Sequence, residues 1–203
     1  EELILDLRLN ILDNFVEKFV IIEAQETHQG KKKDKFLDLK NFKKFENKIK
    51  YVFLEKFPKN LTNWGRENYH RNYINKGIDG VNDNDLIMIS DVDEIPNIKN
   101  FQYKEKFRYT SFKQRNYCYK FNLLNKTYPT WYGTKLCKKK DLRSPQWLRS
   151  QKVKEYFLLR YFKIRWNVVE QGGWHFSYLM EPSEIKKKIE SFGHDEFNLK
   201  KIY

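Results

Sequence analysis

The sequence predicts an α/β fold, with a Rossmann-like, mostly parallel sheet and a smaller antiparallel part in the C-terminal half. Over residues 1–96, short apolar runs alternate with helical patterns, which favours parallel strands joined by helical crossovers. After residue 96 the apolar segments become rich in alternating aromatic residues, which is typical of antiparallel strands. No linker or internal repeat interrupts the chain. We therefore predict a single domain over residues 1–203.

The first half contains two predicted helices and three predicted strands. Residues 3–14 place Leu and Ile at helical spacing, and residues 64–76 are bounded by Asn63 and Gly77, which suit helix ends. Short apolar strands are predicted at residues 19–23, 51–54 and 85–90. The last of these carries an uninterrupted apolar run, so we expect it to be buried on both faces.

Three carboxylates follow this third strand, at Asp91, Asp93 and Glu94. In an extended segment Asp91 and Asp93 would point to one side and Val92 to the core. Two carboxylates on one face can hold Mg²⁺ or Mn²⁺ and leave positions free for phosphate oxygens. The alternative is a polar strand end, because Asp and Glu before proline are common in turns.

The second half predicts further strands and two short helices. Strands are expected at residues 117–121, 131–137, 161–169 and 172–178. Pro145 can begin a short helix, and residues 182–184 begin another that Gly193 closes. Cys118 and Cys137 lie in neighbouring β segments, where a bridge is possible but two buried thiols are the expected state.

Composition limits the class of partner. Lys and Arg number 40 against 27 Asp and Glu, so a net charge of +13 favours nucleotides, nucleic acid or membrane phosphates. The abundance of Lys, Asn, Ile, Phe and Tyr also fits an AT-rich genome. Glycine patterns for dinucleotides or a P-loop, and the Cys and His spacing of zinc sites, are missing. No apolar run reaches the roughly 18 to 20 residues of a membrane span, so the chain as given predicts a soluble, cytoplasmic protein.

Several segments together resemble glycosyltransferase family 17, which includes the animal β-1,4-mannosyl-glycoprotein 4-β-N-acetylglucosaminyltransferase. The most specific are Asp-Val-Asp-Glu-Ile-Pro at 91–96 and Gly-Trp-His at 173–175. The others are residues 8–12, 19–23, 71–74 and 144–146. The resemblance runs nearly end to end and implies a GT-A-like enzyme that inverts the anomeric centre and uses Mn²⁺ or Mg²⁺. Unlike this sequence, the animal enzymes carry a membrane anchor and stem, so Golgi residence would require an anchor that has been removed.

The resemblance also implies roles for individual residues. Residues 1–96 would form the half that binds the nucleotide sugar, with UDP-GlcNAc as donor, and residues 97–203 the half that faces a glycan acceptor. Asp91 and Asp93 would hold the metal, with His175 as a further contact to the metal or the diphosphate. Glu23, Arg71 and Asn72, together with Asp91, would contact the nucleotide sugar. For Arg71 the alternative is a surface ion pair with Glu67.

The catalytic base is left open between several carboxylates. An inverting displacement needs a carboxylate within hydrogen-bond reach of the acceptor hydroxyl. Asp141 and Glu196 are the two candidates, and Glu170 is a third. The competing class is a basic nucleic-acid-binding protein or a metal-dependent nuclease, which the charge and the aromatic content would also suit. We expect no nucleic-acid partner, because a two-metal nuclease needs more converging carboxylates.

Overall fold

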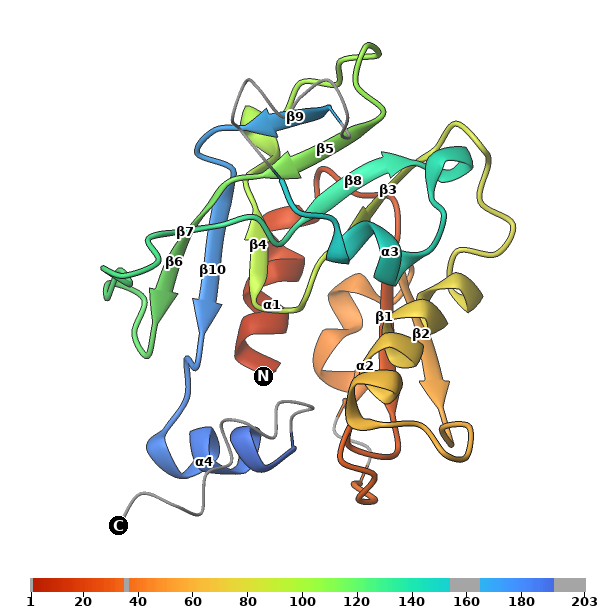
Figure 1. Cartoon of the computed structure of the whole chain (residues 1–203), viewed down its shortest axis with the longest axis vertical. Helices are drawn as coiled ribbons and strands as arrows, with labels where there is room; N and C mark the ends of the chain where they lie inside the picture. The colour runs from red at the N-terminus through yellow and green to blue at the C-terminus, as the bar shows by residue number, and fades with distance from the viewer. Residues whose placement is uncertain (1, 35–36, 154–164, 192–203) are drawn as a thin grey trace. The chain divides into compact units, whose positions relative to one another are not determined.

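The computed structural model describes residues 2–34, 37–153 and 165–191, which form two compact units. One unit comprises Glu1–Phe15 with Gly80–Leu179, and the other comprises Val16–Asp79 with Met180–Tyr203. The boundary predicted after residue 96 does not separate these units, since residues 80–179 belong to one of them. Figure 1 labels the helices and strands, and each unit is described by itself below.

The unit built on Val16–Asp79 holds a two-stranded parallel sheet. β1 (Phe19–Ala24) pairs with β2 (Ile49–Leu54), and Ala24 and Leu54 pack with Phe57 in a small core. α2 begins after Thr62, whose hydroxyl accepts a hydrogen bond from the backbone of Gly65. The helical elements of this unit are η1 (Leu39–Phe45), α2 (Asn63–Asn72), η2 (Tyr73–Lys76) and α4 (Pro182–Ser191).

The other unit contains a four-stranded sheet in the order β4-β10-β6-β7, covered on one face by α1 (Glu2–Leu12). Ile4 of the helix packs with Ile95 and Phe176 of the sheet. Because side chains alternate along a strand, His175 and Glu94 lie on the opposite face from Phe176 and Ile95. The strands are β4 (Glu94–Pro96), β6 (Gln114–Cys118), β7 (Thr130–Trp131) and β10 (Gly173–Ser177).

A second four-stranded sheet of the same unit has the order β3-β8-β5-β9. Phe112, Leu136 and Val169 form its buried core. The strands are β3 (Leu86–Ile89), β5 (Tyr109–Phe112), β8 (Lys135–Lys138) and β9 (Trp166–Val169). The short helices are η3 (Ile98–Asn100), η4 (Lys139–Asp141) and α3 (Pro145–Ser150).

The predicted α/β class is confirmed, but the prediction of a mostly parallel sheet is wrong for the described residues. Of their seven strand pairs, three are parallel and four antiparallel. β3 lies at the edge of its sheet, where it pairs antiparallel with β8 alone, and Leu86 is 41% exposed, so the expected burial on both faces does not hold for the whole strand. An apolar run alone does not reveal whether a strand has a neighbour on each side.

Two further strand predictions change in detail. Residues 131–137 do not form one strand, because β7 and β8 belong to different sheets and residues 132–134 between them are not in a strand. The strand predicted at 117–121 ends at Cys118, since Tyr119 has a left-handed backbone with φ 69°. The beginning of the predicted 161–169 strand lies outside the described residues, as does the Gly193 helix end.

The structure also bears on the two cysteines and on the question of a membrane-spanning helix. Cys118 and Cys137 are both free thiols, Cys137 buried and Cys118 partly buried, and they lie in different sheets. Over the described parts of the chain, no helix combines the length and the apolar character that crossing a membrane requires.

Candidate active site

Asp91 and Asp93 lie in the turn that joins β3 to β4, and Glu94 is the first residue of β4. The backbone of Glu94 donates to the carbonyl of Asp91 over 3.2 Å, and the backbone of Asp91 donates to Oε2 of Glu94 over 3.1 Å. The predicted alternation of an extended strand therefore does not apply to Asp91 and Asp93, although Val92 does pack against the core. The turn carries the chain from one sheet of the unit to the other.

Arg8 holds this turn from α1. Its guanidinium donates to the carbonyls of Asp91, over 3.3 Å, and of Glu94, and to the hydroxyl of Ser90. Burial lowers the pKa of Arg8, and the nearby carboxylates oppose that shift. Arginine suits this position because its planar group can donate to several acceptors at once.

Glu94 is fully buried at the centre of the site. Its Oε1 accepts hydrogen bonds of 2.6 Å from the Trp131 indole and 2.6 Å from Arg149. Burial raises the pKa of Glu94 to about 7 and Asp91 adds to the shift, while Arg149 and Trp131 oppose it. Gly133 leaves the necessary space, because a Cβ there would lie 1.9 Å from Oε1.

Arg149 links Glu94 to Asp91. The same nitrogen that contacts Glu94 lies 3.0 Å from Oδ2 of Asp91. Burial alone would lower the pKa of Arg149, but Glu94 and Asp91 outweigh it and raise the pKa. The guanidinium offsets part of the negative charge that the turn concentrates.

The short helix α3 presents Arg149 to the carboxylates. Ser144 caps its start by accepting from the backbone of Trp147 over 3.1 Å, and Pro145 occupies the first turn. At the other end, the buried Lys135 donates to the carbonyls of Arg149 and Gln151, at 2.5 and 2.6 Å. Both ends of the helix are therefore held by side chains.

His175 lies on the site face of β10, beside Asp93. Its Nε2 is 3.9 Å from Oδ1 of Asp93, and its ring stacks on Trp131 with centroids 4.8 Å apart. Nδ1 is 3.0 Å from Oδ1 of Asn116, whose amide nitrogen donates to the Tyr128 carbonyl. Because an amide oxygen only accepts, Nδ1 carries the proton, and neutral imidazole then presents the Nε2 lone pair.

The pair formed by Asp93 and His175 has the donor chemistry of a cation site. A carboxylate oxygen and an imidazole lone pair at this separation suit a shared divalent ion, and the second ring nitrogen is oriented by Asn116 as metal-binding histidines usually are. Where the chain is described, no group of three His, Cys, Asp or Glu side chains could hold a metal by itself. An ion would need further ligands, such as water or phosphate oxygens.

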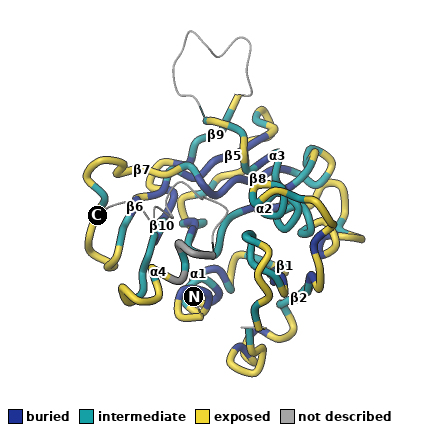
Figure 2. Tube along the Cα trace, turned by 60° about the horizontal axis from the view of Figure 1, so that its bottom comes forward, coloured by how far each residue is buried: buried dark blue, intermediate teal, exposed yellow. Residues whose placement is uncertain are grey.

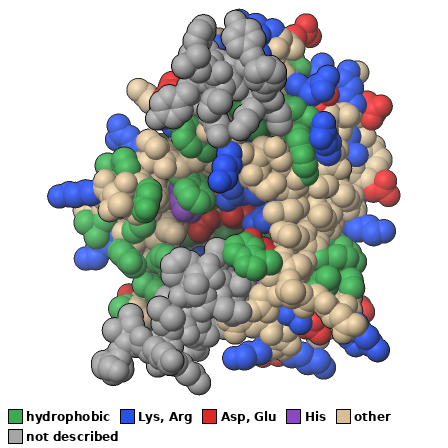
Figure 3. All heavy atoms as spheres, viewed as in Figure 1, with side chains coloured by type: hydrophobic (Ala, Val, Ile, Leu, Met, Phe, Trp, Pro, Cys, Tyr) green, Lys and Arg blue, Asp and Glu red, His purple; other side chains and the backbone are tan. Residues whose placement is uncertain are grey.

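Figure 3 shows acidic and histidine side-chain atoms next to hydrophobic ones on one face of the molecule. Of the three residues that the sequence assigned to the metal, Asp93 and His175 lie side by side, whereas Asp91 contacts Arg149 instead. Arg149 joins Asp91 directly, and Trp131 covers His175. The arrangement can bind a charged ligand and exclude water from one side of the imidazole.

Glu23 lies in the other unit, at the end of β1. Its carboxylate accepts from the Tyr51 hydroxyl, over 2.9 Å, and from the backbone of Leu37, over 3.2 Å, and Lys33 is 3.7 Å away. Burial of the hydroxyl raises the pKa of Tyr51, and the hydrogen bond to the Glu23 carboxylate contributes a smaller part of the same shift. Glu23 thus ties the segment after β1 to the sheet.

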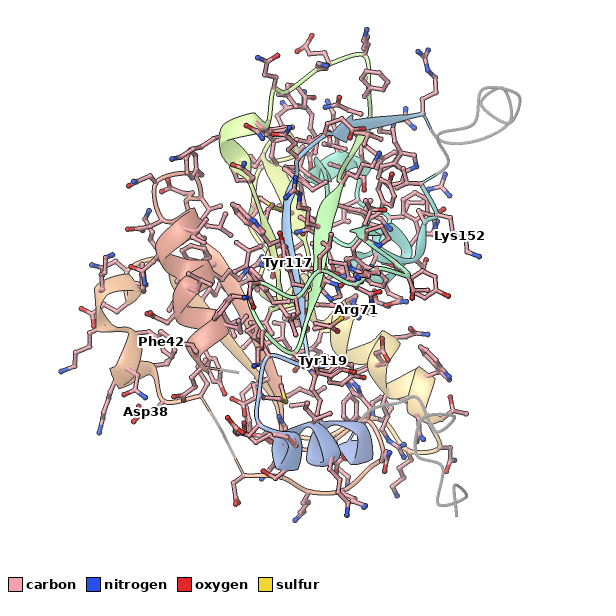
Figure 4. All side chains as sticks on the ribbon, turned by 90° about the vertical axis from the view of Figure 1, so that its left-hand side faces the viewer. Asp38, Phe42, Arg71, Tyr117, Tyr119 and Lys152 are labelled. Carbon is pink, nitrogen blue, oxygen red and sulfur yellow. The ribbon has the colours of Figure 1, made fainter. Side chains whose placement is uncertain are left out.

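Arg71 and Asn72 end α2 in the same unit as Glu23. Arg71 forms an ion pair of 3.3 Å with Glu67, one helical turn earlier. This is the ion pair that the sequence offered as the alternative to a nucleotide contact, although both side chains are partly buried rather than at the surface. Figure 4 labels Arg71.

Asp141 lies at the far end of β3 from the carboxylate turn. The backbone of Lys139 donates to the carbonyl of Asp85, just before β3, whereas Asp91 follows the end of that strand. Asp141 itself forms a 3.1 Å ion pair with Arg108. This position does not bring Asp141 to Asp91 and so does not support it as the base.

The other two candidate bases are Glu170, which the structure describes, and Glu196, which it does not. Glu170 is exposed in the turn between β9 and β10, with its carboxylate 3.4 Å from Lys113. Glu196 lies outside the described residues.

Sequence reasoning missed Arg149, Trp131 and the role of Glu94. Glu94 and Arg8 lie in segments that resemble glycosyltransferase family 17, and so does Ser144, which begins the helix that carries Arg149. These segments were therefore the signal that could have pointed to the site. No sequence spacing relates Trp131 or Arg149 to the carboxylates, because each arrives from a separate element. A buried tryptophan nitrogen needs a partner, but the sequence does not identify it.

A mixed α/β fold with a buried glutamate bound to an arginine, and an aspartate beside an imidazole, defines an enzyme-like site. The sequence model of glycosyltransferase family 17 matches residues 1–201, and the chain therefore belongs to that family. It is a glycosyltransferase, which uses a sugar donor and a glycan acceptor. No curated protein and no solved structure matches the chain.

Proposed function

We propose that the chain transfers GlcNAc from UDP-GlcNAc to a glycan hydroxyl, in a metal-dependent reaction that inverts the anomeric centre. The observation that carries the proposal is the placement of Asp93 and His175, 3.9 Å apart, in the turn and strand that also hold Asp91 and Glu94. Family membership supplies the reaction class. The GT-A arrangement of the nucleotide-sugar half belongs to the same proposal.

Asp93 and His175 would hold Mn²⁺ or Mg²⁺, and the ion would take its other ligands from phosphate and water. Asp91, which the sequence also assigned to the metal, does not form a three-ligand group with this pair among the described residues. When bound, the ion would offset the charge that develops on the leaving diphosphate. The Asp91 carboxylate contacts Arg149 instead.

The residues around Asp93 and His175 have separate roles in this proposal. Arg149 is a positive group beside the carboxylates and can also donate to a diphosphate oxygen. Trp131 shields His175 from water, and Glu94 fixes both Trp131 and Arg149. Glu196 is kept as the candidate base, on sequence grounds alone.

The nucleotide would be contacted by Glu23, Arg71 and Asn72. Glu23 organises the segment after β1 through Tyr51 and the backbone of Leu37. Arg71 would have to exchange its Glu67 partner for the ligand. Strand ends and the loops beyond them are where α/β proteins bind nucleotides.

Replacing Asp93 by Asn tests the proposal. The change removes one charge from the cation site with little change of shape, so Mn²⁺-dependent binding of UDP should weaken and transfer should fall by at least about 10²-fold. Calorimetry with UDP and Mn²⁺, and a transfer assay with UDP-GlcNAc, measure the two effects. The melting temperature should stay close to that of the parent, since Asn keeps the shape of the partly buried Asp93 side chain.

Asp83→Asn is the matched control. Asp83 is exposed before β3 and contributes only its backbone carbonyl to Lys140. It should retain full activity. A parental rate and unchanged metal dependence in Asp93→Asn would contradict the site assignment.

A further inference from the structure

The connection between β6 and β7 exposes an unusual number of large rings. Tyr119 is 58% exposed, Phe121 50% and Tyr128 69%. Figure 2 colours this connection as exposed, and Figure 4 labels Tyr119 at the end of β6. Contiguous exposed aromatic surface on a soluble unit usually marks a binding site.

Hydrogen bonds give the connection a defined shape. The Asn116 side chain donates to the Tyr128 carbonyl over 2.9 Å, and the backbone of Cys118 donates to Leu123 over 2.9 Å. Oδ1 of Asn125 accepts from the backbones of Thr127 and Tyr128, each over 3.0 Å. The rings are thus presented by an ordered hairpin and would lose little conformational entropy on binding.

Two tyrosines at the end of this sheet have a costly backbone conformation. Tyr119 and Tyr178 have φ values of 69° and 55°, which side-chain-bearing residues seldom adopt. Their rings stack with centroids 6.2 Å apart. Strain of this kind is typically kept where it places functional side chains.

The hairpin adjoins the candidate active site, because Asn116 contacts His175 and also donates to the Tyr128 carbonyl. Trp131 pairs with Gln114 at the start of β6, stacks on His175 and remains 37% exposed. Tyr119 follows the other end of the same strand, about 16 Å away at 3.3 Å per residue. Exposed rings therefore lie at both ends of β6, and one end is at the candidate site.

We propose that the glycan acceptor binds along the aromatic surface formed by Trp131, Tyr128, Tyr119 and Tyr178. The C–H faces of sugar rings pack on aromatic rings, and tyrosine hydroxyls can bond their hydroxyl groups. The acceptor sugar that reacts would lie at Trp131, beside His175, and further sugars would follow toward Tyr119. This inference rests on the proposed glycosyl transfer, and it identifies the acceptor as an oligosaccharide rather than a single sugar.

The experiment compares Tyr128→Ala with the parent on acceptors of increasing length. The probes are mannose, a mannotriose and a mannopentaose, with UDP-GlcNAc and Mn²⁺. The substitution should raise KM for the pentasaccharide about tenfold, as expected for the loss of one aromatic contact, and leave kcat unchanged. Hydrolysis of UDP-GlcNAc by water, which needs no acceptor, should not change.

Two further variants serve as controls. Tyr128→Phe keeps the ring and should retain most of the pentasaccharide affinity. Lys126→Ala changes an exposed, non-aromatic residue of the same hairpin and should behave as the parent. Because Tyr128 is 69% exposed, its replacement should not unfold the protein, and melting temperatures check this.

The outcomes separate the two proposals. Unchanged KM for all acceptors in Tyr128→Ala, or a parent that gains nothing from longer acceptors, overturns the acceptor inference alone. A parent that neither hydrolyses nor transfers UDP-GlcNAc overturns the proposed function and this inference with it. Loss of binding to phosphatidylserine vesicles in Tyr128→Ala, with acceptor kinetics unchanged, would assign the surface to a membrane and likewise overturn the inference.

Discussion

His28 and His70 form a contact at the scale of single residues that makes stability depend on pH. Nε2 of His28 lies 3.3 Å from Nδ1 of His70, and the Phe57 ring packs edge-on against both rings. Burial, together with the nearby His28, Lys33 and Arg71, lowers the pKa of His70 to about 4. The folded protein therefore keeps His70 neutral at pH values where the unfolded chain would protonate it.

We predict that this pair destabilises the protein under mild acid. Between an unfolded pKa near 6.5 and the folded value, the unfolded state binds more protons, so the free energy of unfolding falls as pH decreases. Urea unfolding at about pH 7.5 and about pH 5 should show a loss on the order of 2 kcal/mol in the parent that His70→Gln lacks. Equal losses in both proteins would show that His70 does not set this dependence.

The helix α3 shows, at the scale of an element, how one side chain depends on the anchoring of another segment. With six residues it is too short to be stable alone, so its position relies on the Ser144 cap and on Lys135. Lys135 is buried beneath the carbonyl end of the helix, where a positive charge is favourable. Arg149 reaches Asp91 and Glu94 only from a correctly placed helix.

Replacing Lys135 by Met should therefore loosen α3 and leave strand β8 in place. The carbonyls of Arg149 and Gln151 would lose their buried donor, which should cost about 1 to 3 kcal/mol of unfolding free energy. Urea denaturation measures the change, and Lys138→Met on the same strand is the control, since Lys138 is only partly buried and contacts the Tyr103 ring. Similar stability in both variants would argue against the anchoring role.

At the scale of the whole molecule, the dominant property is the net charge of +13. A field of this sign attracts any polyanion, including nucleic acid and nucleotide sugars. The two kinds of binding differ in their response to salt. Polyanion binding releases many counterions and is strongly weakened, whereas a pocket with few charge contacts is weakened far less.

We predict that oligonucleotide binding, measured by fluorescence anisotropy, falls by about 10³-fold or more between about 50 and 200 mM salt. Binding of UDP-GlcNAc with Mn²⁺ should change far less over the same range, and UDP should be preferred to other nucleoside diphosphates. Tight, metal-independent oligonucleotide binding at the higher salt, without any effect of UDP-GlcNAc, would favour the nucleic-acid-binding class.

Several elements, and candidate residues for the site, could be predicted from the sequence alone. Hydrophobic period and capping residues act within a few positions, so α1, β1, β2, α2 and the end of β3 could be predicted. The Asp91, Asp93 and His175 assignment came from motif segments, and the resemblance to glycosyltransferase family 17 is confirmed by the match over residues 1–201.

How the strands pair, and which side chains meet, follows from the three-dimensional packing. The direction of strand pairing and the split of the second half into two sheets depend on contacts between distant segments, which hydrophobic period does not encode. The same holds for Trp131, Arg149 and Arg8, which reach Glu94 or its turn from three separate elements. A buried carboxylate must find donors, but which donors it finds is set by the packing of the whole unit around it.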